Sequence, residues 1–487
     1  MLKQHQKFFA SWLLVSLIIT FSACNTQKQT AKIPLGDIDA FRPILEKHDF
    51  TSKFAPFVRV DLIKLYEVGK LADAAGNNAN APYRGLFGSI PESIPLTSVS
   101  QIISAQDKID QWLYTSPGLL QGWQINPDEA IVLITKTPPK CVYFSYCGFI
   151  FNKYYQKNLE KKWIWTSFND PLNHMTIKTT GTPNGAPGDP FDKDSVIIIT
   201  ADKGIDQRIR KALVEAGYPE DIINTYVIPI SMVSLGIGPE FDSIVFGQRM
   251  ALFDNPQLGE KYVNTITAAL KVTPIEQSPF DPFSAPKLRV RGNGVTEIDY
   301  KPVLDELRLA ILSKYSHLEA KELKTSVWLP ESYDAIQTEL YVAGESRDTS
   351  YLRSETLTLG DNPDEFVIVY GVNHAATGKA TYANCNFYGE EAWNGVVGIY
   401  NTEYAGSAEA FLPGNPLAKF LYVCKFSRTM DSDMVCIKVP DGPLAHGVGL
   451  NQSAFIGFRA YLEPSTKVGP INTELLYDQV IKFHPPK

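Results

Sequence analysis

Short runs of alternating apolar and polar residues, rich in aromatic and β-branched side chains, recur along most of the chain. A period of two residues is typical of a strand with one buried face. Such runs predict strands at 130–135, 141–151, 196–200, 225–230, 243–253 and 267–273, and again at 366–372, 380–388, 420–426, 434–439, 453–462 and 476–483. We therefore expect a mainly β protein with some α, built from antiparallel β-sandwich or jelly-roll-like domains.

Three segments have helical rather than strand spacing. Residues 36–75 form an apolar and charged stretch that predicts an N-terminal helical segment, and residues 201–217 and 301–315 each place apolar side chains on one helical face. Gly217 supplies a stop signal for the second of these helices.

The two sets of strands carry a repeated motif. Five residues recur at identical spacing 210 residues apart, as Ser243, Gly247, Arg249, Leu252 and Gly259, and as Ser453, Gly457, Arg459, Leu462 and Gly469. Asn-Pro-Asp-Glu at 126–129 and at 362–365 also stands before an apolar run in each half, and a Lys and a Tyr three residues apart follow each run. A repeat of this length predicts two duplicated domains rather than a solenoid.

These patterns divide the chain into consecutive parts. They are a signal peptide (1–23), a tether (24–38), an N-terminal helical region (39–110), a first β-domain (111–277), a linker (278–296), and a helix with a second β-domain (297–487).

The N-terminus has the pattern of an export signal. Lys3 and Lys7 precede an apolar run from 8 to 21, which is about five residues too short for a comfortable membrane span. The ending Phe21-Ser22-Ala23-Cys24 resembles the lipobox of bacterial lipoproteins. That resemblance implies an acylated Cys24 holding the chain to a membrane, with Asn25 favouring the outer membrane; an ordinary signal peptide with a chance cysteine is the alternative.

Net charge bears on the expected partner, and the cysteines bear on a possible disulfide. Loss of residues 1–23 removes two of the 46 basic residues and none of the 53 acidic ones, so the net charge becomes −9 and nucleic acid is not an expected partner. Cys424 and Cys436 lie at equal distances from Met430, and a hairpin there would place the two sulfurs opposite each other. An oxidising compartment then predicts a disulfide between them.

Four segments of the first half occur in a characteristic order. They are PPKCVYFSYCGFIF (138–151), DPLNHMTI (170–177), DSVIIITAD (194–202) and SIVFGQRMALF (243–253). This order resembles that of the β-rich domains of unknown function found in exported bacterial proteins. The resemblance supports the predicted fold and implies no activity.

Several familiar catalytic motifs are absent from the sequence, including HExxH, CxxC and GxSxG. The segment 370–382 contains Gly…Gly-Lys, but six residues separate the glycines where a phosphate loop has four. The same segment gathers His374, Lys379 and Tyr382 between two strands, which predicts either an acid/base pair or an anion grip. A long hairpin with a hydrogen-bonded histidine is the alternative.

The repeated arginines Arg249 and Arg459 suggest anion binding, in two equivalent sites or in one site on a pseudo-twofold axis. A structural ion pair is the alternative, and Asp202, Glu345 and Asp348 are the candidate carboxylates.

One Gly- and Pro-rich loop concentrates oxygen ligands. Asn184, Asp189, Asp192 and Asp194 carry the side chains that Ca²⁺ prefers, although no EF-hand spacing is present. A solvated loop explains the same residues, so the sequence predicts no metal site and no cofactor beyond this weak calcium candidate.

Two functions remain open. The first is a non-catalytic envelope lipoprotein that binds a small molecule, a glycan or a protein partner through aromatic surfaces. The second is an enzyme, a hydrolase or a metal-dependent oxidoreductase, acting from the His374 loop.

Overall fold

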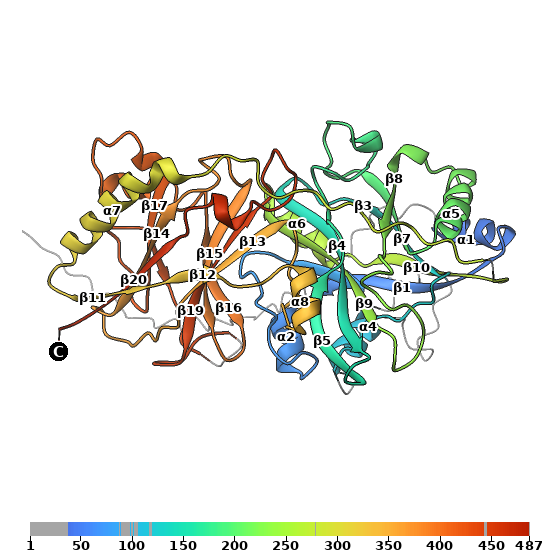
Figure 1. Cartoon of the computed structure of the whole chain (residues 1–487), viewed down its shortest axis with the longest axis horizontal. Coiled ribbons are helices and arrows are strands. Elements are labelled where there is room, and N and C mark those ends of the chain that lie inside the picture. The colour runs from blue at the N-terminus through green and yellow to red at the C-terminus, as the bar shows by residue number, and fades with distance from the viewer. Residues whose placement is uncertain are drawn as a thin grey trace, which may run out of the picture.

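The computed structural model describes residues 38–86, 88, 98, 101, 106–115, 119–277, 279–442 and 446–486. The predicted signal peptide, Cys24 and almost all of the tether lie outside this range. Two β-rich halves lie side by side, the first on the right and the second on the left of Figure 1. The mainly β architecture confirms the predicted fold class. Within the described ranges, no helix is long and apolar enough to cross a membrane.

The first half contains one twisted sheet and several short helices. Its strands are β1 (Phe50–Val60), β2 (Tyr83–Leu86), β3 (Ala130–Lys136), β4 (Cys141–Tyr155), β5 (Glu160–Ser167), β6 (Leu172–Asn173), β7 (Asp194–Thr200), β8 (Ile223–Val227), β9 (Ser243–Phe253) and β10 (Thr267–Pro274). Its helices are α1 (Ile38–Lys47), α2 (Leu62–Glu67), α4 (Gln106–Thr115), α5 (Lys203–Glu215) and α6 (Pro256–Asn264), with 3₁₀ turns η1 (Pro183–Gly185) and η2 (Glu220–Ile222).

The second half contains two five-stranded sheets. Its strands are β11 (Glu319–Leu323), β12 (Thr325–Val327), β13 (Thr349–Ser354), β14 (Phe366–Val372), β15 (Tyr382–Gly389), β16 (Asn394–Tyr400), β17 (Leu421–Ser427), β18 (Cys436–Lys438), β19 (Ala454–Tyr461) and β20 (Gln479–His484). Its helices are α7 (Lys301–Lys314) and α8 (Ser332–Thr338), with 3₁₀ turns η3 (Ile298–Tyr300), η4 (Ser407–Ala410), η5 (Ala418–Phe420) and η6 (Asn472–Glu474).

The order of strands is the same in both halves. In the first half it runs β5-β4-β9-β2-β1-β10-β3-β7-β8, with β6 beside β4. In the second half it runs β16-β15-β19-β13-β12 in one sheet and β11-β20-β14-β17-β18 in the other. The long β1 pairs with β10 along its first part and with β2 along its last, so it takes the places of both β11 and β12. The common ancestry implied by the sequence repeat stays a prediction.

In each half, one part of the β-structure has apolar residues buried on both of its faces. In β3, Ile131 and Leu133 face the core enclosed by the folded sheet, whereas Val132 and Ile134 face the core beneath α1 and α5. This alternation follows from the two-residue period of a strand. The second half repeats it, because β14 places Val367 and Val369 between the two sheets and its intervening residues beneath α7.

The predicted N-terminal helical region is only partly helical. Helices α1 and α2 are present, but residues 50–60 form β1 and residues 83–86 form β2, so this region belongs to the first sheet. Burial along β1 favours extended structure, since Phe54 to Val58 are buried continuously between β10 and β2. Pairing with β10, more than 200 residues away in sequence, therefore overrides the local pattern.

The predicted disulfide between Cys424 and Cys436 is wrong. Strands β17 and β18 run parallel, and Cys436 stands opposite Lys425 rather than opposite Cys424. Since side chains alternate between faces along a strand, Cys436 lies on the face opposite to Cys424. The sulfur of Cys424 instead points into the sandwich core, 3.9 Å from the sulfur of Cys385 on β15.

Candidate functional site

The loop between β14 and β15 carries His374, which is buried. Its Nδ1 lies 2.9 Å from both carboxylate oxygens of Glu297, and its Nε2 lies 3.7 Å from Oδ2 of Asp478. Burial by itself would lower the pKa of His374, but the two carboxylates outweigh burial and raise that pKa to about 10. The imidazole is therefore a charged partner of buried acids rather than a group that titrates near neutral pH.

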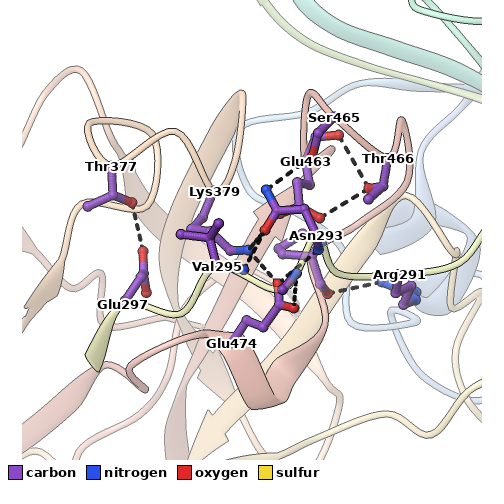
Figure 2. A network of polar contacts seen from close by, with 12 residues as sticks. Arg291, Asn293, Val295, Glu297, Thr377, Lys379, Glu463, Ser465, Thr466 and Glu474 are labelled. Carbon is purple, nitrogen blue, oxygen red and sulfur yellow. Dashed lines mark hydrogen bonds and ion pairs between the residues drawn. The ribbon is translucent and has the colours of Figure 1, made fainter. Parts of the chain in front are cut away.

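Lys379 lies on the same loop within the polar network of Figure 2. Its Nζ donates to Oε1 of Glu463 at 2.6 Å, to Oε2 of Glu474 at 2.5 Å and to Oδ1 of Asn293 at 3.1 Å. Figure 2 shows these acceptors gathered around the lysine from the segment that joins the halves and from the C-terminal part of the chain. Two carboxylates beside the ammonium repel a further anion, so this geometry does not favour an anion grip.

Tyr382 lies away from both of these side chains, at the start of β15. Its hydroxyl accepts a hydrogen bond from Nδ2 of Asn384 at 2.7 Å, and its ring packs on that of Tyr461 with centroids 5.0 Å apart. Tyr461 follows Arg459 by two residues on β19 and lines a different site. The three residues grouped by sequence are thus divided between two locations.

That different site is a cavity at the boundary between the two halves, which we call the boundary cavity. Arg249 of β9 and Arg459 of β19 both line it, together with Tyr83, Tyr351 and Tyr461. Its volume is about 60 Å³, where one water needs roughly 10–15 Å³ on the same measure. The two repeated arginines therefore share one location that has room for a few waters or a small molecule.

Each arginine reaches a loop that belongs to the other half of the chain. Arg249 donates from Nη1 to the Tyr351 hydroxyl at 3.0 Å and from Nη2 to the carbonyl of Gly344. Arg459 donates from Nη2 to the carbonyl of Gly76. We call residues 73–80 the first boundary loop and residues 341–348 the second boundary loop.

The boundary loops exchange main-chain hydrogen bonds with the opposite halves. The first loop donates from Ala74 to the carbonyl of Ala392 at 2.8 Å, and the second donates from Val342 to the carbonyl of Ile164 at 2.9 Å. Their tips share an uncommon backbone conformation, because Ala75 has φ 53° and Ala343 has φ 50°. Positive φ is costly for alanine and persists where the surrounding structure holds the backbone in place.

Sequence reasoning missed these loops, although a signal was present. Ala75-Gly76 is followed by Tyr83, and Ala343-Gly344 is followed by Tyr351, with identical spacing at an offset of 268 residues. This offset differs from the 210 residues between the two arginine motifs, and an alignment held to that one offset does not detect it.

The predicted carboxylate partners do not pair with the arginines. Within the part of the chain that the structure describes, no ion pair involves Arg249 or Arg459. Asp202 caps helix α5, Glu345 accepts from the hydroxyls of a threonine and a serine on β5, and Asp348 accepts from a tyrosine and an asparagine. The structural ion pair considered from sequence is therefore absent from these arginines.

Asp348 is nevertheless a buried carboxyl near these arginines, and its pKa is raised. It accepts from the Tyr143 hydroxyl at 3.1 Å and from Nδ2 of Asn173 at 2.9 Å. Burial raises the pKa of Asp348 to about 7, although these two hydrogen bonds and the charge of Arg249 lower it. Its charge therefore offsets the arginines only in part near neutral pH.

The Gly- and Pro-rich loop does not assemble its oxygen ligands. Asp189 contacts Lys193 at 3.4 Å and Asp194 contacts Lys136 at 3.3 Å, so two of the candidate calcium ligands face lysines. Across the described ranges, no three His, Cys, Asp or Glu side chains are placed to hold a metal ion.

Comparison with known proteins gives no family. No family model matches the chain, and no curated protein matches it. Among solved structures, the chain is similar to an uncharacterised protein from Burkholderia cenocepacia, at 10% sequence identity and a TM-score of 0.37, over 94% of this chain and 91% of that one. A similarity of this size says nothing of what either protein does.

Proposed function

We propose that this protein is a non-catalytic lipoprotein of the cell envelope that binds a small molecule in the boundary cavity. The observation that carries the proposal is the meeting of the buried Arg459 and the half-buried Arg249, one from each half, at a cavity where neither forms an ion pair with a described residue. A buried charge without a partner destabilises the folded protein by roughly several kcal/mol. A ligand of opposite charge would remove this cost, so the site favours a bound ligand.

The size of the cavity supports a small molecule over a glycan or a protein partner. A second cavity of about 300 Å³ shares Leu329 and Tyr351 with the boundary cavity. A ligand larger than the 60 Å³ of the boundary cavity would extend past these two side chains.

The envelope location rests on the sequence around Cys24. Several acyl chains on one cysteine anchor a protein firmly, because each buried methylene contributes roughly 0.8 kcal/mol. Growth with an alkyne fatty acid should label the full-length chain, and Cys24→Ala should remove the label and release the protein from the membrane fraction. Labelling that survives Cys24→Ala would reject the anchor.

Mass spectrometry of residues 25–487, exported without the lipid cysteine, tests ligand binding. Extra mass that survives native conditions and disappears on denaturation is the expected result, with the denatured spectrum as the internal control. A bare mass under native conditions, from cells that supply the natural ligand, contradicts the proposal. No observation favours the alternative of an enzyme at His374, since that side chain is buried between carboxylates.

A further inference from the structure

The guanidinium groups of Arg249 and Arg459 both line the boundary cavity. Tyr351 links them, since Arg249 Nη1 lies 3.0 Å from its hydroxyl and the Arg459 guanidinium carbon lies 5.7 Å from its ring centroid. Each guanidinium has five N–H groups. In the described ranges their acceptors are neutral, namely backbone carbonyls and tyrosine hydroxyls. Neither guanidinium is thus paired directly with an anion, and Asp348 offsets their charge only in part.

A third donor borders the same space. Trp165 lines the cavity, is 6% exposed, and its indole N–H has no hydrogen-bond partner among the described residues. A Cβ placed on Gly344 would stand 3.2 Å from Trp165 Nε1 and 3.5 Å from Arg249 Nη2. A side chain at position 344 would therefore crowd both donors, and glycine lets them lie close to the backbone of this loop. A buried N–H without an acceptor costs about 1–3 kcal/mol, which a ligand oxygen would remove.

Arg84 and Gln248 also line the cavity, and the rest of its wall is largely apolar. Val60, Leu62, Phe149, Val245 and Leu329 contribute aliphatic and aromatic surface. Phosphate or sulfate exposes oxygen on every side and would meet this surface unfavourably. A carboxylate places two oxygens at one end and an apolar group at the other, and arginine recognises its planar fork with paired hydrogen bonds.

We infer that the boundary cavity binds a small organic carboxylate, held by Arg249, Arg459 and the indole N–H of Trp165. The inference rests on the proposed function and specifies the chemistry of its ligand. The carboxylate would supply the charge that the arginines lack, and its apolar part would lie against the aliphatic wall.

Titration of the exported chain with propionate tests this inference, with propionamide as the neutral molecule of the same shape. Isothermal titration calorimetry should show saturable binding of propionate, and binding of propionamide at least about tenfold weaker. Chloride and phosphate at the same ionic strength should not compete. Equal binding of propionamide, or equal competition by either inorganic anion, would overturn the assignment of a carboxylate.

Trp165→Phe locates the site while keeping an aromatic ring. Loss of the indole donor should weaken propionate binding about tenfold, by the value of a hydrogen bond to a charged group. Trp163→Phe is the matched control, because Trp163 does not line the cavity. Both indoles pack on Phe151, with ring centroids 5.0 Å away for Trp165 and 5.2 Å away for Trp163. Unchanged affinity in Trp165→Phe would remove the site from this cavity.

Arg249→Gln and Arg459→Gln should each abolish measurable binding where the variant folds, as judged by circular dichroism. If neither arginine variant folds, the comparison of Trp165→Phe with Trp163→Phe still decides the test. A chain that carries extra native mass but binds no propionate overturns only the carboxylate inference. A chain with no native mass and no propionate binding overturns the proposed function as well.

Discussion

At the scale of single residues, His374 illustrates how burial changes the meaning of a sequence signal. The imidazole touches Glu297 and Asp478, and the Thr377 hydroxyl also donates to Glu297 at 2.7 Å. His374→Ala would leave two carboxylates buried beside an empty space. We expect a loss of about 3–5 kcal/mol in the free energy of unfolding, measured by urea denaturation.

His317→Ala is the control for that measurement, because His317 is exposed. It should change the free energy of unfolding by less than about 0.5 kcal/mol. Near-wild-type stability in His374→Ala would instead mean that the loop tolerates the change, and would reopen the enzyme hypothesis from sequence.

The same residue predicts how stability depends on pH. The folded pKa of His374 is raised from 6.5 to about 10, so its contribution to stability is fully present below pH 6.5 and is lost as pH rises toward 10. Wild-type protein should therefore lose stability between pH 7 and pH 10 more steeply than His374→Gln. Parallel pH profiles of the two proteins in urea denaturation would contradict this assignment.

At the scale of secondary-structure elements, the sandwich core of the second half brings together two cysteines from different sheets. The sulfurs of Cys385 on β15 and Cys424 on β17 lie 3.9 Å apart, and from this proximity we predict that they can be oxidised to a disulfide. Burial raises the pKa of the Cys385 thiol, so we expect the bond to form during folding in an oxidising compartment rather than afterwards.

Mass spectrometry after alkylation in denaturant measures this bond. Exported protein alkylated without reduction should carry two alkyl groups fewer than the same protein reduced first, and Cys385→Ser should abolish the difference. Cys436→Ser is the control and should retain it, because Cys436 lies on the other face of its sheet. A difference lost in Cys436→Ser but kept in Cys385→Ser would restore the pairing expected from sequence.

Most individual elements were predictable because their patterns are local. The strands at β3, β4, β9 and β14 and the helices α5 and α7 lie within a few residues of their predicted positions. The parallel pairing of β17 with β18 was not predictable in this way. Short strands joined by a polar loop resemble a hairpin in sequence, and only the position of each strand in the sheet decides their direction.

At the scale of the whole molecule, the two halves hold each other through the boundary loops. Main-chain hydrogen bonds cross the boundary in both directions, and Tyr143 packs on Tyr461 with ring centroids 4.8 Å apart. We expect the halves to remain associated when the chain joining them is cut. A protease site inserted between the exposed residues Ser284 and Ala285 allows this test.

After cleavage, the two fragments should elute together in size-exclusion chromatography under native conditions. The same sample in concentrated urea is the control and should give two separate species. Separate elution under native conditions would show that the boundary contacts are too weak to hold the halves, and that the boundary cavity depends on an intact linker.

The sequence by itself determined the mainly β fold class, most strands, the helices α5 and α7 and the repetition of Arg249 and Arg459, because each depends on spacing along the chain. Only the tertiary structure decided that these arginines meet at one cavity, that Tyr382 lies apart from His374 and Lys379, and that Cys424 faces Cys385. These relations join residues tens to hundreds of positions apart. They depend on how sheets pack and which loops cross the boundary. A local pattern of hydrophobic and polar residues does not determine either of these.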